Sequence, residues 1–268
     1  MTTAVILAAA QAVCSTSLPA QPKITIDQSI PQISHAVLLA VGEDIYTEIT
    51  ALFQGRPPLD LPISVFRSDI PITSLDDWAK PTEIRIGTTV TNGSPDQFTF
   101  QFAHEMGHVM LDPRRNNGFV DAICAALALK MLDDLAIKWQ THPPLDSLRG
   151  FDLSRYRRLV DVDFSAMFPA DIREAVRNGN WMVVIGYLRE HRTGVEPTGG
   201  SPAYRNLQWL AAVSILAAPV RWENLRGIAA CTEPRPEVEP AFALLPLSAA
   251  CLQTVKDIDC RIGSACGP

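Results

Sequence analysis

Apolar residues recur every three or four positions along residues 33–53, and the sequence Gly-Arg-Pro-Pro that follows ends the pattern. This period predicts a helix with one buried face. Along residues 82–90, apolar and polar residues alternate instead, with Ile84, Ile86 and Val90 on one side, which predicts a half-buried strand. A short run rich in β-forming residues, 61–68, predicts a second strand.

A helix is predicted over residues 97–112, because Pro113 stops it and residues 114–118, Arg-Arg-Asn-Asn-Gly, reverse the chain. The apolar pattern resumes over residues 119–139 and predicts a second helix, which the Pro-containing stretch 141–147 ends. Further helices are expected over residues 153–160, 169–178, 181–190 and 204–218. This order indicates an α+β fold, in which a small sheet with a backing helix precedes a mostly helical second half.

We expect a first unit over residues 23–140, which contains the small sheet, its backing helix and the two helices that follow. A helical part of the same domain or subdomain is expected over residues 141–225. Residues 226–268 form a segment rich in Pro and Cys. Residues 1–22 contain an apolar run followed by small and polar residues, which is the order found in a signal peptide, although no positive residues precede the run. We therefore expect either an export signal or a flexible or helical N-terminus.

Composition narrows the function classes. A net charge of −6, 47% hydrophobic residues and no basic run interleaved with aromatics favour a soluble globular protein with a peptide or small-molecule partner over a nucleic-acid binder. The apolar run 207–220 is shorter than the roughly 20 residues that span a bilayer, so it predicts a core helix. Four of the six cysteines follow residue 230 and favour a secreted or periplasmic protein with disulfides; a cytoplasmic protein with reduced cysteines is the alternative.

The candidate chemistry lies in the sequence His-Glu-Met-Gly-His, residues 104–108. On a helix, residues four apart lie on the same face, so His104 and His108 present two imidazoles to one point with Glu105 beside them. Phe98, Phe102, Met106 and Val109 fall on the opposite face and can pack against a core. Two histidines hold a zinc ion only with a third protein ligand, and a fourth position must stay open for chemistry.

Asp121 is the expected third ligand. It stands in the first turn of the second helix, and an antiparallel return of the chain brings it back beside His108. Asp112 lies eight residues from His104, about 12 Å along the helix axis, and cannot close the same site. Asp133 and Asp134 lie three turns beyond Asp121 and are too far away.

This set of ligands predicts hydrolysis of a peptide or amide bond. Zinc would lower the pKa of water and polarise a carbonyl, and Glu105 would transfer the proton from water to the leaving amine. The strand at residues 82–90 is the expected place for an extended substrate to add as a further strand.

The sequence "FQFAHEMGHVML" resembles the zincin metallopeptidases, in particular their gluzincin-like branch. With "NNGFVDAICAALALKML" it resembles a group of little-characterised bacterial zincin-like proteins. The resemblance implies a zincin-like sheet with an active-site helix over about residues 84–139. The usual acid at the third ligand position of that group is Glu, and Asp121 is one methylene shorter. The metzincin continuation is absent, because Leu111 and Arg114 stand where that pattern needs Gly and His or Asp.

Alternatives stay open for several of these residues. The same cleft could serve a non-catalytic zincin-like protein that binds metal or a partner, and a helix pair without metal is the third interpretation. Gly107 either permits close packing near the metal or is simply tolerated in the helix. Cys124 is expected to be a small buried residue. The candidates for oxyanion stabilisation are Tyr156, Tyr204, His142 and His191.

Overall fold

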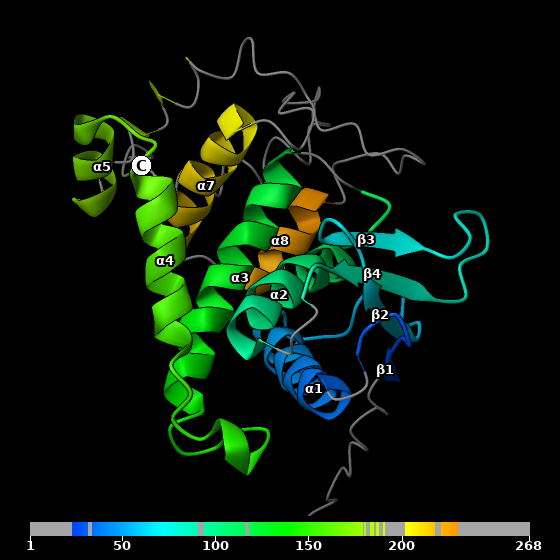
Figure 1. Cartoon of the computed structure of the whole chain (residues 1–268). Helices are drawn as coiled ribbons and strands as arrows, with labels where there is room; N and C mark the ends of the chain where they lie inside the picture. Colours follow the sequence, from blue (N-terminus) through cyan, green and yellow to red (C-terminus); the bar gives the residue numbers. More distant parts are fainter. Residues whose placement is uncertain are drawn as a thin grey trace, which may run out of the picture.

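The computed structural model describes residues 23–31, 34–90, 94–115, 118–178, 180, 183–184, 186–187, 190, 202–217 and 221–229. Its elements follow in the order β1 (Ile24–Ile26), α1 (His35–Leu52), β2 (Ile63–Arg67), β3 (Ile72–Leu75), β4 (Ile84–Thr88), α2 (Pro95–Leu111), α3 (Gly118–Lys138), η2 (Asp146–Leu148), α4 (Leu153–Ser165), α5 (Ala170–Arg177), α7 (Pro202–Ala217) and α8 (Trp222–Ala229). The α+β class is confirmed: a four-stranded sheet precedes a mainly helical part (Figure 1).

The sheet has the strand order β1-β2-β4-β3, in which β1, β2 and β4 are parallel and β3 is antiparallel to β4. The predicted strand at residues 82–90 is confirmed as β4. Its expected role as the strand that receives a substrate is wrong, because β2 and β3 already hydrogen-bond both of its edges. Among the described strands, β3 and β1 form the two edges.

Burial alternates along the central strands. Ile63, Val65, Ile84 and Ile86 are at most 1% exposed, whereas Arg85 points away from this core, with its guanidinium carbon 4.7 Å from the centre of the Phe66 ring. Helix α1 contacts β1, and α2 contacts β4 and β3. The apolar face of the sheet is thus the one that the helices cover, as alternating side chains on a half-buried sheet require.

A buried amide fixes α2 against the end of β4. The Thr88 hydroxyl and the Thr89 backbone N–H donate hydrogen bonds to Gln101 Oε1, at 2.7 and 3.0 Å. Gln101 Nε2 in turn donates to Thr89 Oγ1 at 2.7 Å. Pro95 begins the helix two residues before the predicted start, and its missing N–H costs nothing at this position. The helix ends at Leu111, and Asp112 adopts a left-handed backbone with φ of 79°.

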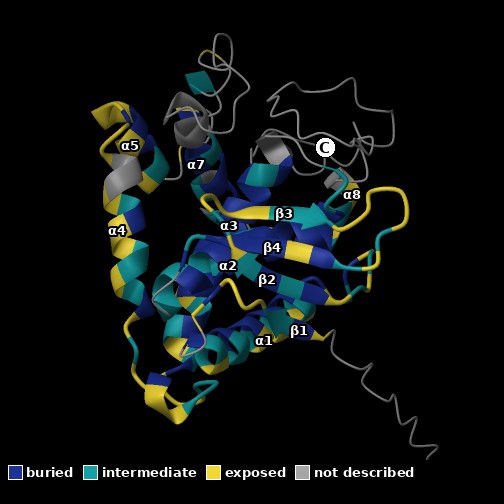
Figure 2. Ribbon diagram, turned by 45° about the vertical axis from the view of Figure 1, so that its right-hand side comes forward, coloured by how far each residue is buried: buried dark blue, intermediate teal, exposed yellow. Residues whose placement is uncertain are grey.

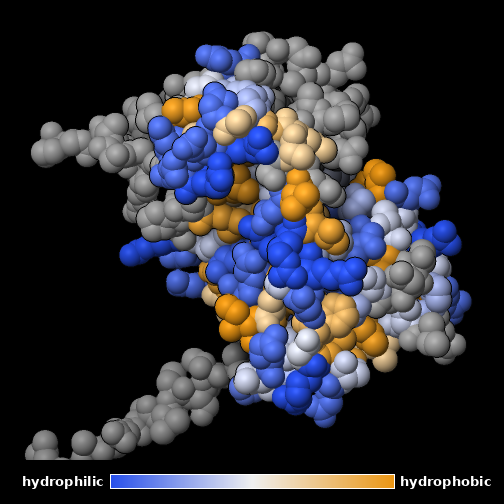
Figure 3. All heavy atoms as spheres, turned by 60° about the vertical axis from the view of Figure 1, so that its left-hand side comes forward, coloured by the Kyte–Doolittle hydropathy of each residue, from blue (hydrophilic) through white to orange (hydrophobic). Residues whose placement is uncertain are grey.

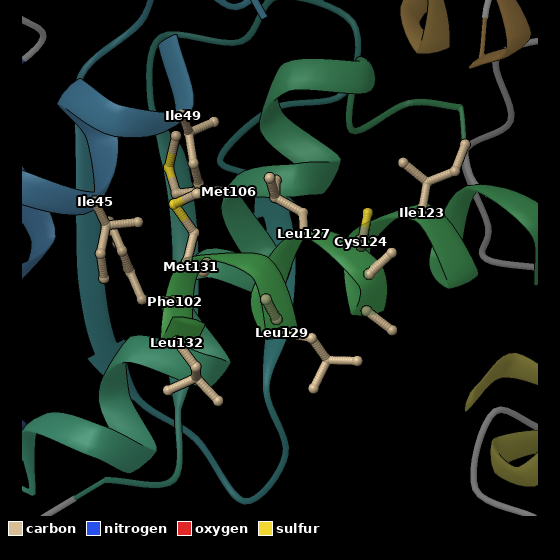
Figure 4. Close-up of a cluster of buried hydrophobic side chains, with 14 of the residues drawn as sticks. Ile45, Ile49, Phe102, Met106, Ile123, Cys124, Leu127, Leu129, Met131 and Leu132 are labelled. Atoms are coloured by element: carbon tan, nitrogen blue, oxygen red, sulfur yellow. The ribbon is translucent and has the colours of Figure 1, made fainter. Parts of the chain in front are cut away.

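Residues 122–129 of helix α3 are all buried, and Figure 2 draws buried residues in dark blue. The helix contacts α1, α2, α4, α7 and α8, and a helix that is apolar all round needs such surroundings. Figure 4 shows its residues Leu127 and Met131 in one cluster with Ile45 of α1 and Met106 of α2. The expected apolar residues of α2 (Phe98, Phe102, Met106, Val109) are fully buried in the same core.

The helical second half agrees with the prediction in part. Helix α5 and helix α7 match the expected spans within two residues, whereas α4 extends to Ser165, five residues further than predicted. Helix α8 was not predicted, and the boundary expected at residue 226 falls inside it. Half of the residues of the predicted helix 181–190 lie outside the described residues, as do residues 1–22 and the four cysteines beyond residue 230.

The outer surface is mixed in character. Leu159, Val162 and Met167, on and just after α4, are 50% to 64% exposed. On the face drawn in Figure 3, apolar and hydrophilic residues are interspersed.

The run around residue 210 is a core helix as expected, because Trp209, Leu210 and Ala212 of α7 are buried. Within the described part of the chain, no helix combines the length and the apolar character that crossing a bilayer needs.

Candidate metal centre

Helices α2 and α3 bring together the three residues that the sequence indicates as metal ligands. Asp121, in the first turn of α3, has its Oδ1 atom 3.1 Å from His104 Nε2 and 3.4 Å from His108 Nε2. The two imidazole rings lie edge to face, 5.2 Å apart at 64°. The return of the chain after the turn at Asp112 therefore places the acid where its position in the sequence predicts.

The three residues have the chemistry and the spacing of a metal site. Their ligand atoms all lie within 4.8 Å of one another. Bonds of about 2.0–2.1 Å to zinc at tetrahedral angles place neighbouring ligand atoms about 3.3 Å apart, close to the two distances from Asp121. The side chains of His104 and Asp121 are 16% and 20% exposed, so solvent reaches the centre. The residues thus fit a divalent metal, and two imidazoles with one carboxylate are a donor set that zinc accepts.

The electrostatics of this centre depend on the acid between the two rings. Burial works to raise the pKa of Asp121, yet the hydrogen bonds and charges of His104 and His108 outweigh it and hold that pKa well below its usual range. Burial likewise works to lower the pKa of His104, but the hydrogen bond and charge of Asp121, with the charge of Glu105, raise it. Asp121 is therefore ionised, which is the form that binds a metal.

Glu105, the expected general base, lies beside the histidines and is 3% exposed. Its carboxylate is held by the edge strand of the sheet: the Thr73 hydroxyl of β3 lies 2.7 Å from Glu105 Oε2 and 3.1 Å from the Glu105 backbone oxygen. A hydroxyl has one hydrogen to donate, and the shorter contact is to the carboxylate. Thr73 thus orients the acid without neutralising its charge.

The three nearby acids that are not expected to be ligands, Asp112, Asp133 and Asp134, pair with other residues. Asp112 accepts hydrogen bonds from Arg114 Nε and Nη2, both at 2.8 Å. Asp133 lies 3.4 Å from the Arg157 guanidinium, and Asp134 lies 2.9 Å from Lys130. Each of them pairs with a cation away from the histidines, as expected from its position along the chain.

Among the four candidates for oxyanion stabilisation, Tyr156 of α4 lies beside α2, with its ring 5.8 Å from that of Phe100. Phe100 precedes His104 by one helical turn and shares its face. His142 is exposed and hydrogen-bonds Thr141 beyond the C-terminal end of α3. Because α3 has 21 residues, His142 lies about 30 Å along the axis from the turn that carries Asp121. The side chains of Tyr204 and His191 lie outside the described residues.

Two residues of this centre were missed from the sequence. Thr73, which donates to the Glu105 carboxylate, precedes Glu105 by 32 residues. Gln208 of α7 follows Asp121 by 87 residues, and the Gln208 side-chain amide donates to the Asp121 backbone oxygen at 3.3 Å. A lone Thr on a short strand and a lone Gln on a helix carry no spacing signal. Cys124, by contrast, is the small buried residue expected: it is fully buried, and burial raises the pKa of its thiol, as do the charges of Asp121 and Glu105.

Comparisons with known proteins add no family. No family model matches the chain, and no curated protein matches it.

Proposed function

We propose that this protein is a zinc-dependent hydrolase of peptide or amide bonds, in which His104, His108 and Asp121 hold the metal. The observation that carries the proposal is the position of Asp121 Oδ1, 3.1 and 3.4 Å from the two imidazole nitrogens, on a separate helix. The resemblance of "FQFAHEMGHVML" to zincin metallopeptidases supports the same assignment.

The reaction assigns a separate role to Glu105. Zinc, when bound, would supply Lewis acidity toward a carbonyl oxygen and toward water. Glu105 accepts the proton from the attacking water and returns it to the leaving amine. The Thr73 hydroxyl keeps the carboxylate in one orientation during these transfers, because it donates to Oε2. Tyr156 is the remaining described candidate for a donor to the oxygen of the tetrahedral intermediate.

The edge strand β3 is the proposed place for the substrate, in place of β4. Its pairing with β4 uses one side of the strand, so the other side offers backbone groups to an extended peptide. Thr73 belongs to this strand and touches Glu105, so a peptide added there lies next to the proposed base. The exposed Ile70 and Ile72, 62% and 36% exposed, would give such a peptide apolar contacts.

The test combines elemental analysis with an activity screen of the purified full chain. We expect one zinc ion per chain in the wild type, loss of zinc in His108→Ala and Asp121→Ala, and retention of zinc in Glu105→Gln. On any peptide that the wild type cleaves, Glu105→Gln should lower kcat by at least about 100-fold.

The outcomes separate the classes of function. Full activity of Glu105→Gln with zinc retained would overturn the proposed mechanism. Zinc binding without cleavage across a broad peptide library would instead indicate a metal-binding or partner-binding protein. A wild type that takes up no zinc during reconstitution would mean that the two histidines serve only the helix pair.

A further inference from the structure

Helices α2 and α3 approach each other most closely at a glycine next to a proposed ligand. A Cβ atom added to Gly107 would lie 2.8 Å from Cys124 Sγ and 3.0 Å from both Cys124 Cα and Cβ. Ordinary contacts between carbon atoms are about 3.5–4.0 Å. A side chain at position 107 would therefore require the Cys124 side chain to shift and the backbone of α3 to move away from α2 by at least a few tenths of an ångström.

The contact between Gly107 and Cys124 lies close to a proposed metal ligand on each helix. Gly107 immediately precedes His108 on α2, and Cys124 follows Asp121 by one turn on α3. Residues three apart on a helix lie on the same face, so Asp121 and Cys124 both face α2. The separation of the helices at Gly107 and Cys124 thus sets how far Asp121 must reach to meet the two imidazoles.

We propose that Gly107 is a positioning residue for the metal: its missing side chain lets α3 approach α2 closely enough for the short side chain of Asp121 to complete the site. Aspartate has one methylene less than glutamate, so it can serve as third ligand only if the helix that carries it lies close. This inference rests on the proposed zinc site and explains which feature makes an aspartate sufficient there.

A purely structural role predicts a different behaviour. Alanine is the better helix former, so a glycine that is merely tolerated would leave zinc binding unchanged when replaced by alanine. Gly42 of α1 supplies the matched control, because it too is a buried glycine inside a helix. A Cβ there would lie 3.5 Å from the Phe102 ring, which is an ordinary contact.

The experiment measures the zinc dissociation constant of the full chain by competition with a chromophoric chelator. We expect Gly107→Ala to weaken zinc binding about 10- to 100-fold, the range for changes that displace a ligand without removing it, and Gly42→Ala to leave it unchanged. In the Gly107→Ala background, Asp121→Glu should recover much of the lost affinity, because the added methylene spans the wider gap. A general loss of folding would show no such rescue.

Circular dichroism and thermal unfolding accompany each titration. If Gly107→Ala does not fold, the double variant Gly107→Ala/Cys124→Gly removes two of the three opposing atoms and should fold and bind zinc more tightly than the double variant Gly107→Ala/Cys124→Ala. Equal affinity of that pair, or wild-type affinity in a folded Gly107→Ala, would overturn the inference alone. A wild type that binds no zinc would overturn the proposed function as well.

Discussion

Two aspartates lie on either side of the turn between α2 and α3, and they have different partners. Asp112 accepts two hydrogen bonds from the Arg114 guanidinium, and Arg115 Nε lies 3.3 Å from it. Asp121 has two imidazoles instead. A guanidinium has donors only and keeps its proton, so the first cluster is complete and cannot take a metal. An imidazole without its proton offers a lone pair, so the second cluster can. The partner decides which acid can become a ligand.

The largest expected effect tests this difference directly. Asp121→Asn should weaken zinc binding by more than about 100-fold, because it removes a metal ligand, whereas the loss of a residue that only holds a ligand in place costs up to about that much. Asp112→Asn, the same change nine residues earlier, should leave the zinc dissociation constant within about two-fold, because arginines that lose a partner expose no site for zinc. Both constants can be measured by chelator competition at pH 7.

Two results would contradict the comparison. Equal loss of zinc in the two variants would mean that the turn, and not the ligand, controls binding. Unchanged affinity in Asp121→Asn would place the third ligand on another residue.

The two helices of the centre could be predicted because their signals are local. The period of apolar residues, Pro113 and the reversing loop define both helices within about two residues, and the return of a short loop places Asp121 beside His108. The ligands thus come from one stretch of chain, residues 104–121. Their chemistry is also carried by residue types that are uncommon on an apolar helix, which makes them visible.

The sheet was only half predicted, because pairing between distant segments decides it. Strands β1 and β3 have three and four residues, and Ile72 of β3 is 36% exposed, so neither shows a clear alternation. The position of each strand in the sheet depends on the strand that it pairs with, which is β2 for β1 and β4 for β3. β-Propensity alone rarely reveals such pairing. The same reason hid Thr73: its contact with Glu105 exists only once β3 pairs with β4.

A smaller effect is expected at Glu105, whose carboxylate accepts a hydrogen bond from the neutral hydroxyl of Thr73. Thr73→Val removes the hydroxyl that donates to Glu105 Oε2 at nearly constant volume. Because a hydrogen bond to a charged group is lost, kcat on a cleaved peptide should fall about 10-fold. The zinc dissociation constant and KM should stay close to those of the wild type, since Thr73 is not a proposed ligand.

Thr73→Ser supplies the matched variant, because it keeps the hydroxyl and loses only a methyl group. Recovery of kcat by Ser but not by Val would identify the hydrogen bond as the cause. If Ser and Val lower kcat equally, the packing of β3 against α2 matters and the orientation of Glu105 does not.

The smallest expected effect is on the free energy of unfolding in acid. It concerns Asp112, the aspartate that pairs with Arg114. Burial works to raise the pKa of Asp112, but the hydrogen bonds and charge of Arg114 outweigh it and lower the pKa below the ordinary value of 3.8. A lowered pKa means that the carboxylate stabilises the fold at pH values above 3.8, and that this contribution is lost as the pH falls through the folded-state value. Because both arginines are partly exposed, the contribution is about 1 kcal/mol.

Urea unfolding of the wild type and Asp112→Asn at several pH values checks this sign. We expect the wild type to be more stable by about 1 kcal/mol at pH 7, and the difference to shrink as the pH falls below 3.8, where Asp112 takes up a proton and comes to resemble the amide. Asp121 is present in both proteins, so its own titration cancels from the difference. A difference that stays constant from pH 7 to pH 2 would mean that the shape of the turn, and not the arginine pairing of Asp112, stabilises it.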